Sequence, residues 1–392
     1  MTAPLKILQI VPSISLVYGG PSQMVRGLSA ALASYAQVTV LTTDANGDVD
    51  QPPLDVPLGQ PMAEDGYEVI YFRCSPFRRY KFSVGLLNWL WANAHRYDVA
   101  HIHALFSPVS TAAATVARWR GLPYILRPLG TLDPADLRKK RRLKQIYVSL
   151  AERANIAGAA AIHFTSPQEA KVSERFGLKT QDWVFPLGVS LPPTADREAA
   201  RKALQQQFQI PAGGPIVLFM SRIDPKKGFD LLLPALEKVQ QQGQGFHFLL
   251  CGANPQDRAY EAAIHQQIQA SSLAACTTLT GFVTGEMKAQ ILAAADLFVL
   301  PSYYENFGIA VAEAMAAGLP VVISDQVHIW PDIQRSSSGW VTPCEVEPLA
   351  AALAQAIADP AERQKRGQQA RDYAAECYSW DAIAQQMRVA YG

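Results

Sequence analysis

Short, continuously apolar runs recur along the whole chain, and each is followed by a longer segment with helical spacing. Strands that are buried on both faces look like this in sequence, because helices cover both sides of their sheet. The alternation predicts βαβ units and parallel sheets, which is a doubly wound α/β architecture. The runs expected as strands are Ile7–Val11, Val38–Leu41, Val69–Phe72, Val99–Ile102, Tyr124–Leu126, Ala161–Phe164, Trp183–Phe185, Ile216–Met220, Phe246–Leu250, Thr277–Leu279, Leu297–Leu300 and Val321–Ile323.

Prolines interrupt the pattern near the middle of the chain. The stretch Pro186–Pro193 precedes a helix-like segment, Asp196–Phe208, and marks a connection between domains. A chain of 392 residues is more than twice the usual length of one domain, so two domains are expected, each with its own core. We therefore predict one domain over residues 1–190 and a second over residues 191–377.

The two predicted domains carry opposite charge although the whole chain is nearly neutral. Up to Ser190 there are 20 basic and 14 acidic residues, and the remainder has 15 and 20. The formal net charge of +1 argues against nucleic acid as a partner. Five widely spaced cysteines without a C-x-x-C pair favour a reduced, cytoplasmic setting. No apolar run reaches the roughly 20 residues that cross a bilayer, so any membrane association is expected to be peripheral.

Two glycines follow the first expected strand. Ligands bind open α/β sheets beyond the carboxyl ends of the strands, so strand-to-helix turns are the places to search. Gly19 and Gly20 would let the backbone approach a ligand closely, and the helix that follows would offer free N–H groups to an anion. A G-x-G-x-x-G fingerprint for dinucleotides is absent. Taken alone, the turn is equally consistent with an ordinary tight turn.

A basic turn follows the expected strand Ile216–Met220. It contains Arg222, Lys226 and Lys227 just before a new helix. Arg222 can bind two oxygens of a diphosphate at once, and Lys227 can add a mobile point charge. The turn therefore predicts a pyrophosphate site, and a solvated basic loop is the alternative interpretation.

Two glutamates follow the expected strand Leu297–Leu300. Glu305 falls in a loop, and Glu313 falls in a helix that begins at about Gly308. A loop carboxylate can hold sugar hydroxyls, a helical one can hold ribose hydroxyls, and the amides at the helix start can contact an anion. Either glutamate taken alone is better explained as a surface helix residue. Their combination with the basic turn, in this order, indicates a site for a sugar nucleotide.

These motifs together resemble family 4 of the retaining glycosyltransferases, which have the GT-B fold. The resemblance rests on Glu305-x7-Glu313, on the turn from Ser221 to Gly228 and on Gly19-Gly20. It covers essentially the whole chain and is weaker between Asp44 and Arg96. It implies two Rossmann-like domains that face a central cleft, the first binding the acceptor and the second the donor. A C-terminal helix at about 378–392 would return to the first domain.

The resemblance also implies roles for individual residues. The implied catalytic residues are His103, Glu305, Arg222 and Lys227. The implied donor-binding residues are Gly19, Gly20, Phe282, Val283, Asn306, Phe307, Gly308, Ile309 and Glu313. Arg222 and Lys227 would hold the diphosphate, and His103 would contact the transferred sugar. The donor β-phosphate oxygen would accept the proton of the acceptor, so no carboxylate nucleophile is required.

Two patterns that suggest a metal are set aside. His101 and His103 share one face of a strand, but no third ligand is evident, and His101 is expected to be a buried, hydrogen-bonded residue. Asp48-Val49-Asp50 has the D-x-D pattern of metal-dependent transferases, but it lies in a loop rich in Asp, Gly and Pro. Cationic Arg222 and Lys227 can replace a divalent ion. We therefore predict no metal and no cofactor besides a UDP- or GDP-sugar as co-substrate.

A basic helical segment, residues 138–144, accounts for much of the excess charge of the first domain. Such a segment suits an anionic membrane surface on the cytoplasmic side or a solvated helix face. Since the resemblance places the acceptor in this domain, a lipid-linked glycan is the expected acceptor. The candidate acceptor-binding residues are Arg127, Thr131 and Asp133.

The sequence therefore predicts a retaining transferase that acts in lipid-linked or cell-surface polysaccharide biosynthesis. A transferase with a small soluble acceptor, such as a sugar phosphate, is the first alternative. An epimerase or phosphorylase of the same fold, and a non-catalytic protein that binds a sugar nucleotide, also remain open. The base, the sugar and the acceptor are not specified, because a few loop atoms decide them.

Overall fold

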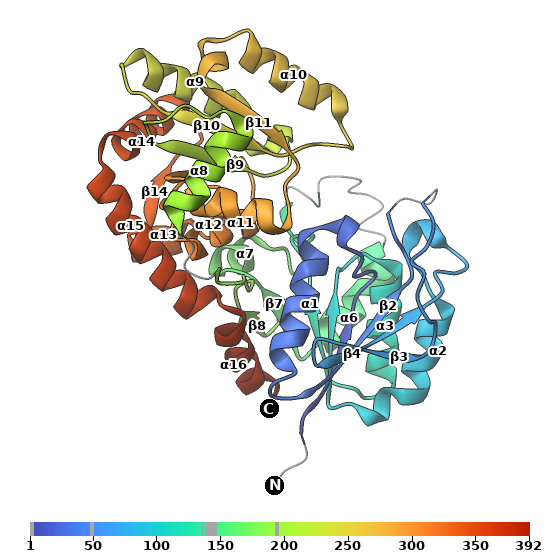
Figure 1. Ribbon diagram of the computed structural model, residues 1–392. Coiled ribbons are helices and arrows are strands. Elements are labelled where there is room, and N and C mark those ends of the chain that lie inside the picture. The colour runs from blue at the N-terminus through green and yellow to red at the C-terminus, as the bar shows by residue number, and fades with distance from the viewer. Residues whose placement is uncertain (1–3, 48–50, 135–136, 138–146, 193–195) are drawn as a thin grey trace. The chain divides into compact units, whose positions relative to one another are not determined.

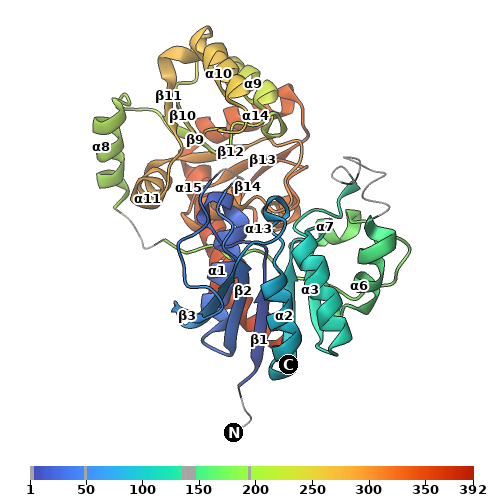
Figure 2. The same cartoon turned by 90° about the vertical axis from the view of Figure 1, so that its right-hand side faces the viewer.

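The computed structural model describes residues 4–47, 51–134, 137, 147–192 and 196–392 (Figures 1 and 2). The chain divides into two compact units. Unit 1 comprises Met1–Gly188 together with Trp380–Gly392, and unit 2 comprises Val189–Ser379. The predicted α/β class, with two units built on parallel sheets, is confirmed.

Unit 1 contains, within its described residues, an eight-stranded sheet in the order β3-β4-β2-β1-β5-β6-β7-β8. Every neighbouring pair is parallel except β3 and β4. The strands are β1 (Lys6–Ile10), β2 (Gln37–Thr43), β3 (Pro61–Glu64), β4 (Tyr67–Phe72), β5 (Val99–His103), β6 (Tyr124–Arg127), β7 (Ala161–Phe164) and β8 (Asp182–Val184).

Helices cover both faces of this sheet (Figure 2). Ile10 and Ile102 point into a core formed with helices α2, α3 and α6. Because side chains alternate along a strand, His101 and His103 point to the opposite face, which α1 and α16 cover. The helices of unit 1 are α1 (Gly20–Leu32), α2 (Val84–Asn93), α3 (Pro108–Trp119), α6 (Arg153–Gly158), α7 (Pro167–Val172) and α16 (Trp380–Tyr391).

The C-terminal helix α16 packs on α1 through Trp380. A Cβ atom at Gly188 would lie 2.0 Å from the Trp380 ring, and one at Gly27 would lie 2.4 Å from it. Only glycine therefore allows the ring to lie so close to the backbone at both positions. This packing places the last residues of the chain in unit 1.

Unit 2 contains, in its described part, a six-stranded parallel sheet in the order β11-β10-β9-β12-β13-β14. Its strands are β9 (Ile216–Met220), β10 (His247–Cys251), β11 (Thr277–Gly281), β12 (Leu297–Leu300), β13 (Val321–Ser324) and β14 (Gly339–Thr342). Its helices are α8 (Arg197–Phe208), α9 (Phe229–Gln241), α10 (Arg258–Gln269), α11 (Gly285–Ala294), α12 (Ile309–Ala316), α13 (Trp330–Ser336), α14 (Val346–Ala358) and α15 (Pro360–Tyr373).

Each sheet has a point at which the strand order reverses. In unit 1 the point lies between β1 and β5, and in unit 2 it lies between β9 and β12. The crevice beyond the carboxyl ends of the strands at such a point is the usual ligand site of an open α/β sheet. Gly19 and His103 belong to the first pair of strand ends, and Arg222 and Glu305 belong to the second.

Two strands are absent from the sequence prediction. β3 is an edge strand whose side chains alternate between exposed and half-buried, so it has no continuous apolar run. β14 reads Gly-Trp-Val-Thr, which is too short and mixed to stand out, although it is paired along its length with β13. None of the helices in the described part of the chain is long and apolar enough to cross a membrane.

Candidate functional site

The basic turn and the glutamate loop of unit 2 meet at the carboxyl ends of β9 and β12. The ammonium group of Lys227 forms an ion pair with the Glu305 carboxylate. Both side chains are mostly buried, with 15% of Lys227 and 24% of Glu305 exposed. The pair is therefore shielded from bulk water while an edge of each group stays accessible to a ligand.

Backbone contacts hold the turn against the loop. The amide of Tyr303 donates to the carbonyl of Lys226 at 2.8 Å, and the Tyr303 hydroxyl donates to Asp230 at 2.6 Å. Gly228 has a left-handed φ of 73°, and a Cβ atom there would lie 2.2 Å from the carbonyl oxygen of Pro301. The glycine thus allows the close backbone approach that brings Lys227 to Glu305.

The glutamate loop is also fixed on its other side. The amide of Glu305 donates to the carbonyl of Gln326 at 3.1 Å, and the amide of His328 donates to the carbonyl of Glu305 at 3.0 Å. Gly308, with a φ of 82°, is the N-cap of α12, and Ile309 is its first residue. The start of α12 therefore lies next to Glu305, as expected from the sequence, while the ring of Phe307 is buried against Tyr378.

Glu313 has a partner that sequence reasoning missed. The Lys288 ammonium group lies 2.5 Å from the Glu313 carboxylate. Lys288 belongs to α11 and Glu313 to α12, so the two meet only through the fold. No spacing along the sequence links them.

Among the remaining predicted donor residues of unit 2, Arg222 follows β9 and Asn306 follows β12, whereas Phe282 and Val283 lie at the end of β11. Arg222 is exposed and donates to the side-chain oxygen of Gln256 at 3.0 Å. Phe282 and Val283 directly follow β11, and the Phe282 ring is 78% exposed. An aromatic ring this exposed offers a stacking surface for a base. Asn306, in the glutamate loop, is half-buried.

In unit 1, Gly19 connects a short 3-10 turn to α1. Its backbone has φ 68° and ψ −132°, a conformation that glycine alone adopts without strain. Gly20 is the first residue of α1, Pro21 has no N–H group, and the amides of Ser22 and Gln23 donate to the carbonyl of Gly19. The start of α1 therefore offers the Gly20 amide to a ligand, which is fewer free N–H groups than the sequence predicted.

His103 belongs to a buried polar cluster on the face of the sheet that α1 and α16 cover. Its Nε2 atom lies 2.7 Å from the side-chain oxygen of Gln9, and His101 stacks on it with ring centroids 4.6 Å apart. Burial holds the pKa of His103 well below its ordinary value, and the charge of Arg127 lowers it further. The ring is therefore neutral at pH 7.

The other histidines of the cluster form a chain of hydrogen bonds. His163 Nε2 donates to the carbonyl of Phe185 at 3.0 Å, so its Nδ1 accepts a hydrogen bond from His101 Nε2 at 3.2 Å. His101 Nδ1 then accepts from the Tyr391 hydroxyl at 2.6 Å. The expectation that His101 is buried and hydrogen-bonded is confirmed.

Gln9, His163 and Tyr391 are cluster members that sequence reasoning missed. Gln9 and His163 each stand inside an otherwise apolar run, and a polar residue inside a buried strand is a signal that could have indicated them. Tyr391 carries no such signal, since it reaches the cluster from the C-terminal helix.

Among the predicted acceptor residues, Arg127 is fully buried. Its Nη1 atom contacts the sulfur of Met24, and within the described chain its Nε and Nη2 atoms have no hydrogen-bond partner. Burial lowers the pKa of Arg127 to about 10, so it stays charged at pH 7. Thr131 donates to the carbonyl of Pro128 at 2.8 Å, and Asp133 is buried.

No metal-binding cluster of three or more His, Cys, Asp or Glu side chains occurs in the part of the chain that the structure describes. Asp48, Asp50 and the basic segment 138–144 lie outside the described residues.

Two family models match the chain in succession. Residues 19–188 match a glycosyl transferase 4-like domain, and residues 200–373 match glycosyl transferases group 1. The chain belongs to the group 1 glycosyltransferases. It is therefore a glycosyltransferase, and the family to which the sequence motifs pointed is confirmed.

Relatives of this glycosyltransferase agree with the family. It is 28% identical over 399 aligned positions to the D-inositol 3-phosphate glycosyltransferase of Xylanimonas cellulosilytica, and the match covers 95% of this chain and 91% of that protein. It is 29% identical to the alpha-D-kanosaminyltransferase of Streptomyces kanamyceticus, where the match spans 50% of each chain.

Solved structures of this fold resemble the glycosyltransferase over its whole length. The sucrose-phosphate synthase of Thermosynechococcus elongatus is 26% identical, with a TM-score of 0.74 and coverage of 99% of this chain and 98% of that one. A protein of Anabaena that was solved with UDP-glucose is 21% identical, with a TM-score of 0.75 and coverage of 98% and 99%. These structures have the GT-B fold, and the likeness extends through both units of the chain.

Proposed function

We propose that this glycosyltransferase moves a sugar from a UDP- or GDP-sugar to an acceptor hydroxyl with retention of configuration and without a divalent metal. The observation that carries the donor assignment is the Lys227–Glu305 pair at the reversal point of the unit 2 sheet. A cation and a carboxylate side by side match a diphosphate next to a sugar. The Anabaena protein that binds UDP-glucose has the same fold, which supports a donor of this kind.

Each group in unit 2 has a role in this proposal. Lys227 and Arg222 neutralise the diphosphate, and the backbone amides at the start of α12 donate to its oxygens or to the sugar. Glu305 accepts from sugar hydroxyls and Glu313 from ribose hydroxyls, while Phe282 and Val283 contact the base. Lys227 and Lys288 already hold these carboxylates in place before the donor binds.

In the proposed reaction the bond between the anomeric carbon and the β-phosphate oxygen breaks. The acceptor oxygen forms its bond to the same face of that carbon, and its proton passes to the departing β-phosphate. Lys227 and Arg222 stabilise the charge that develops on the nucleoside diphosphate, which is the role that a divalent ion has in other transferases. His103, which is neutral, contacts the transferred sugar as a hydrogen-bonding group, while Gly19 allows a close approach of the backbone and the Gly20 amide provides a donor from unit 1.

The acceptor is proposed to carry a phosphate, because Arg127 retains its charge while two of its donor groups have no partner among the described residues. A lipid-linked glycan diphosphate at the cytoplasmic face of a membrane is the first candidate. A soluble sugar phosphate or polyol phosphate is the second, since two of the whole-length relatives bear the names of a D-inositol 3-phosphate glycosyltransferase and a sucrose-phosphate synthase. Thr131 and Asp133 complete the proposed acceptor contacts.

The experiment that tests this proposal measures release of UDP or GDP from a panel of sugar nucleotides. We expect release to depend on a phosphorylated acceptor and to continue unchanged in excess EDTA. The anomeric proton coupling of the product, measured by NMR, should match that of the donor sugar. Loss of activity in EDTA with recovery in magnesium would contradict metal independence, and an inverted product would contradict retention.

The two acceptor classes can be separated in the same assay. Vesicles that contain an undecaprenyl diphosphate sugar would support the lipid-linked acceptor, and inositol phosphates or hexose phosphates would support the soluble one. Flotation with and without anionic lipid provides an independent measurement. Equal recovery of the protein from both kinds of vesicle would reject a role for the anionic membrane surface.

A further inference from the structure

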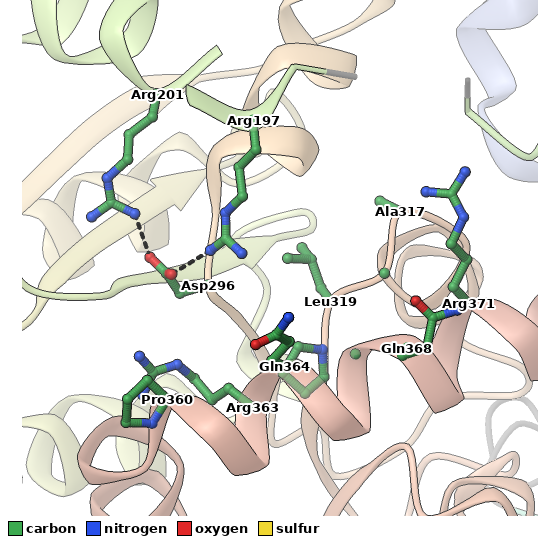
Figure 3. Close-up of a pocket in the computed structure, with 13 residues that line it drawn as sticks. Arg197, Arg201, Asp296, Ala317, Leu319, Pro360, Arg363, Gln364, Gln368 and Arg371 are labelled. Atoms are coloured by element: carbon green, nitrogen blue, oxygen red, sulfur yellow. Dashed lines mark hydrogen bonds and ion pairs between the residues drawn. The ribbon is translucent and has the colours of Figure 1, made fainter. Parts of the chain in front are cut away.

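A second cavity lies in unit 2, away from the candidate site (Figure 3). Its volume is about 590 Å³, which is within the usual range for small-molecule pockets. It lies between the start of α8, the face of α15 and the loop that precedes β13. Asp296 and Pro320, which line it, stand just before β12 and β13, so the cavity is at the amino edge of the parallel sheet. The candidate donor site is at the opposite, carboxyl edge.

The lining of this cavity is strongly basic. It contains Arg197, Arg201, Arg363 and Arg371, and Asp296 is its single acidic residue. Both Arg197 and Arg201 pair with the Asp296 carboxylate, as Figure 3 shows. One carboxylate shared by two guanidinium groups leaves the cavity with excess positive charge.

Arg363 has no carboxylate partner among the described residues. Its Nη1 atom donates to the carbonyls of Ala356 and Ile357 at 2.6 and 2.7 Å. Burial lowers the pKa of Arg363, and the charges of Arg197 and Arg201 lower it further while Asp296 raises it. Like charges are therefore close enough to repel one another, and an anion between them would relieve the repulsion.

The helix ends at the cavity wall are already capped. Helices α8 and α15 both begin there, with Arg197 and Pro360 as their first residues. The carboxylates of Asp196 and Asp359 accept hydrogen bonds from the amides of Ala199 and Glu362 in these first turns. The last carbonyls of α12 likewise accept hydrogen bonds from the amides of Ala317, Gly318 and Leu319. The attraction for an anion therefore comes from the arginine side chains.

Uncharged polar groups and a small-residue wall complete the lining. Gln364 and Gln368 are exposed side chains on the face of α15 and can donate to or accept from hydroxyl groups. Gly318 and Gly367 are in close contact, since a Cβ atom at Gly367 would lie 2.3 Å from the carbonyl oxygen of Gly318. The absence of side chains at these positions lets α15 pack directly against the loop that precedes β13.

We propose that this cavity binds a small phosphorylated polyol, with its phosphate between Arg197 and Arg363 and its hydroxyls on Gln364 and Gln368. Arginine is the side chain best suited to phosphate, because its planar group can donate two hydrogen bonds at once. The site is separate from the donor site, and α12 links them, since it begins beside Glu305 and ends at Ala316, directly before Ala317 of the cavity wall.

The test measures thermal unfolding and isothermal titration with glucose 6-phosphate and inositol 1-phosphate as probes, and with glucose as the unphosphorylated control. For the wild-type chain we expect saturable binding and a rise in Tm of about 2–4 °C with each phosphorylated probe and none with glucose. The Arg197→Gln/Arg363→Gln variant should lose this response, whereas Lys227→Gln, at the donor site, and Arg127→Gln, at the proposed acceptor site, should keep it.

A second variant leaves the arginines unchanged, so the ion pairs of Arg197 and Arg201 with Asp296 stay intact. Gln364→Glu introduces a negative charge at an exposed position of the cavity, and we expect it to weaken binding at least tenfold. Gln267→Glu makes the same change on an exposed face of α10 and should bind like the wild type. Both variants should unfold at the wild-type temperature in the absence of probe.

Three results would overturn the proposal. The first is an absent response in the wild type, and the second is a response that the cavity variants keep. The third is a response that Lys227→Gln abolishes, which would assign binding to the donor site. A separate experiment uses vesicles that contain phosphatidic acid. Binding to these vesicles that requires Arg363, together with no response to the soluble probes, would overturn the polyol phosphate and indicate a lipid headgroup as the ligand.

Discussion

The two units present different kinds of polar groups at the same topological position. At the reversal point of unit 2, charged side chains stand on loops and pair with one another, as Lys227 does with Glu305. At the reversal point of unit 1, His103 is neutral, buried and held by Gln9. Unit 2 can therefore meet a charged ligand by exchanging ion-pair partners, whereas unit 1 offers hydrogen-bonding groups in fixed orientations.

The largest expected effect follows from removing the charged pair of unit 2. Lys227→Gln or Glu305→Gln should lower the turnover number about 10²- to 10³-fold, because each removes a group that contacts the reacting part of the donor. The measurement is initial-rate kinetics of nucleoside diphosphate release. Lys226→Gln, which changes the neighbouring exposed lysine, is the matched control and should remain within a few-fold of wild type.

Turnover close to wild type in both variants, with donor binding retained, would refute the assignment of the site. Circular dichroism and the unfolding temperature should be unchanged, because the turn is also held by the backbone contact between Tyr303 and Lys226. A variant that unfolds early would instead show that the ion pair supports the fold.

The next effect should appear in the pH dependence of stability. Burial lowers the pKa of His163 to about 3, so the ring stays neutral in the folded chain while it gains a proton in the unfolded chain below about pH 6.5. Stability should therefore fall as the pH decreases, by about 2 kcal/mol for this ring between pH 6.5 and 5. Urea unfolding at several pH values measures the slope.

His163→Gln should flatten this slope in unit 1. The matched control is His247→Gln in unit 2, where burial also lowers the pKa but the ring is less enclosed, so the change in slope should be smaller. Equal slopes in the wild type and in His163→Gln would show that the ring titrates normally. Burial would then not lower the pKa of His163 in the folded chain.

The smallest effect concerns the hydroxyl of Tyr391. Tyr391→Phe removes the donor to His101 Nδ1 and leaves a buried acceptor unsatisfied, at a cost of about 1–3 kcal/mol in the free energy of unfolding. Turnover at saturating substrate should change little. As a control, Tyr80→Phe removes a hydroxyl from a ring that is 57% exposed and should leave stability unchanged.

If Tyr391→Phe unfolds like the wild type, the C-terminal helix is held by Trp380 and apolar packing alone. If Tyr391→Phe instead lowers turnover strongly at unchanged stability, the hydrogen bond from Tyr391 to His101 helps to orient His103, on which His101 stacks. Either result would refine the contrast between the two units, because unit 2 has no counterpart of this chain in its described residues.

Much of the fold followed from local patterns. Apolar runs such as Ile7–Val11 and Leu297–Leu300 predict buried strands because a short, doubly covered strand has to be apolar along its length. Glycines such as Gly308 predict helix starts that need a left-handed backbone. The order of Gly19-Gly20, Arg222, Lys227 and Glu305 then indicates the family. The sequence analysis did not predict β14 and β3, because a four-residue strand of mixed composition has no distinctive hydrophobic period.

The sequence by itself thus determined the succession of strands and helices, the identity of the family and the loops that carry its charged residues. Only the tertiary structure decided which strands lie at the reversal points, that Lys227 meets Glu305 and Lys288 meets Glu313, and that Tyr391 reaches His101 from the far end of the chain. It also decided that two pairs of arginines from distant segments, Arg197 with Arg201 and Arg363 with Arg371, line one cavity. The physical reason is that charge pairing and burial depend on distances across the fold, which residue order alone does not specify.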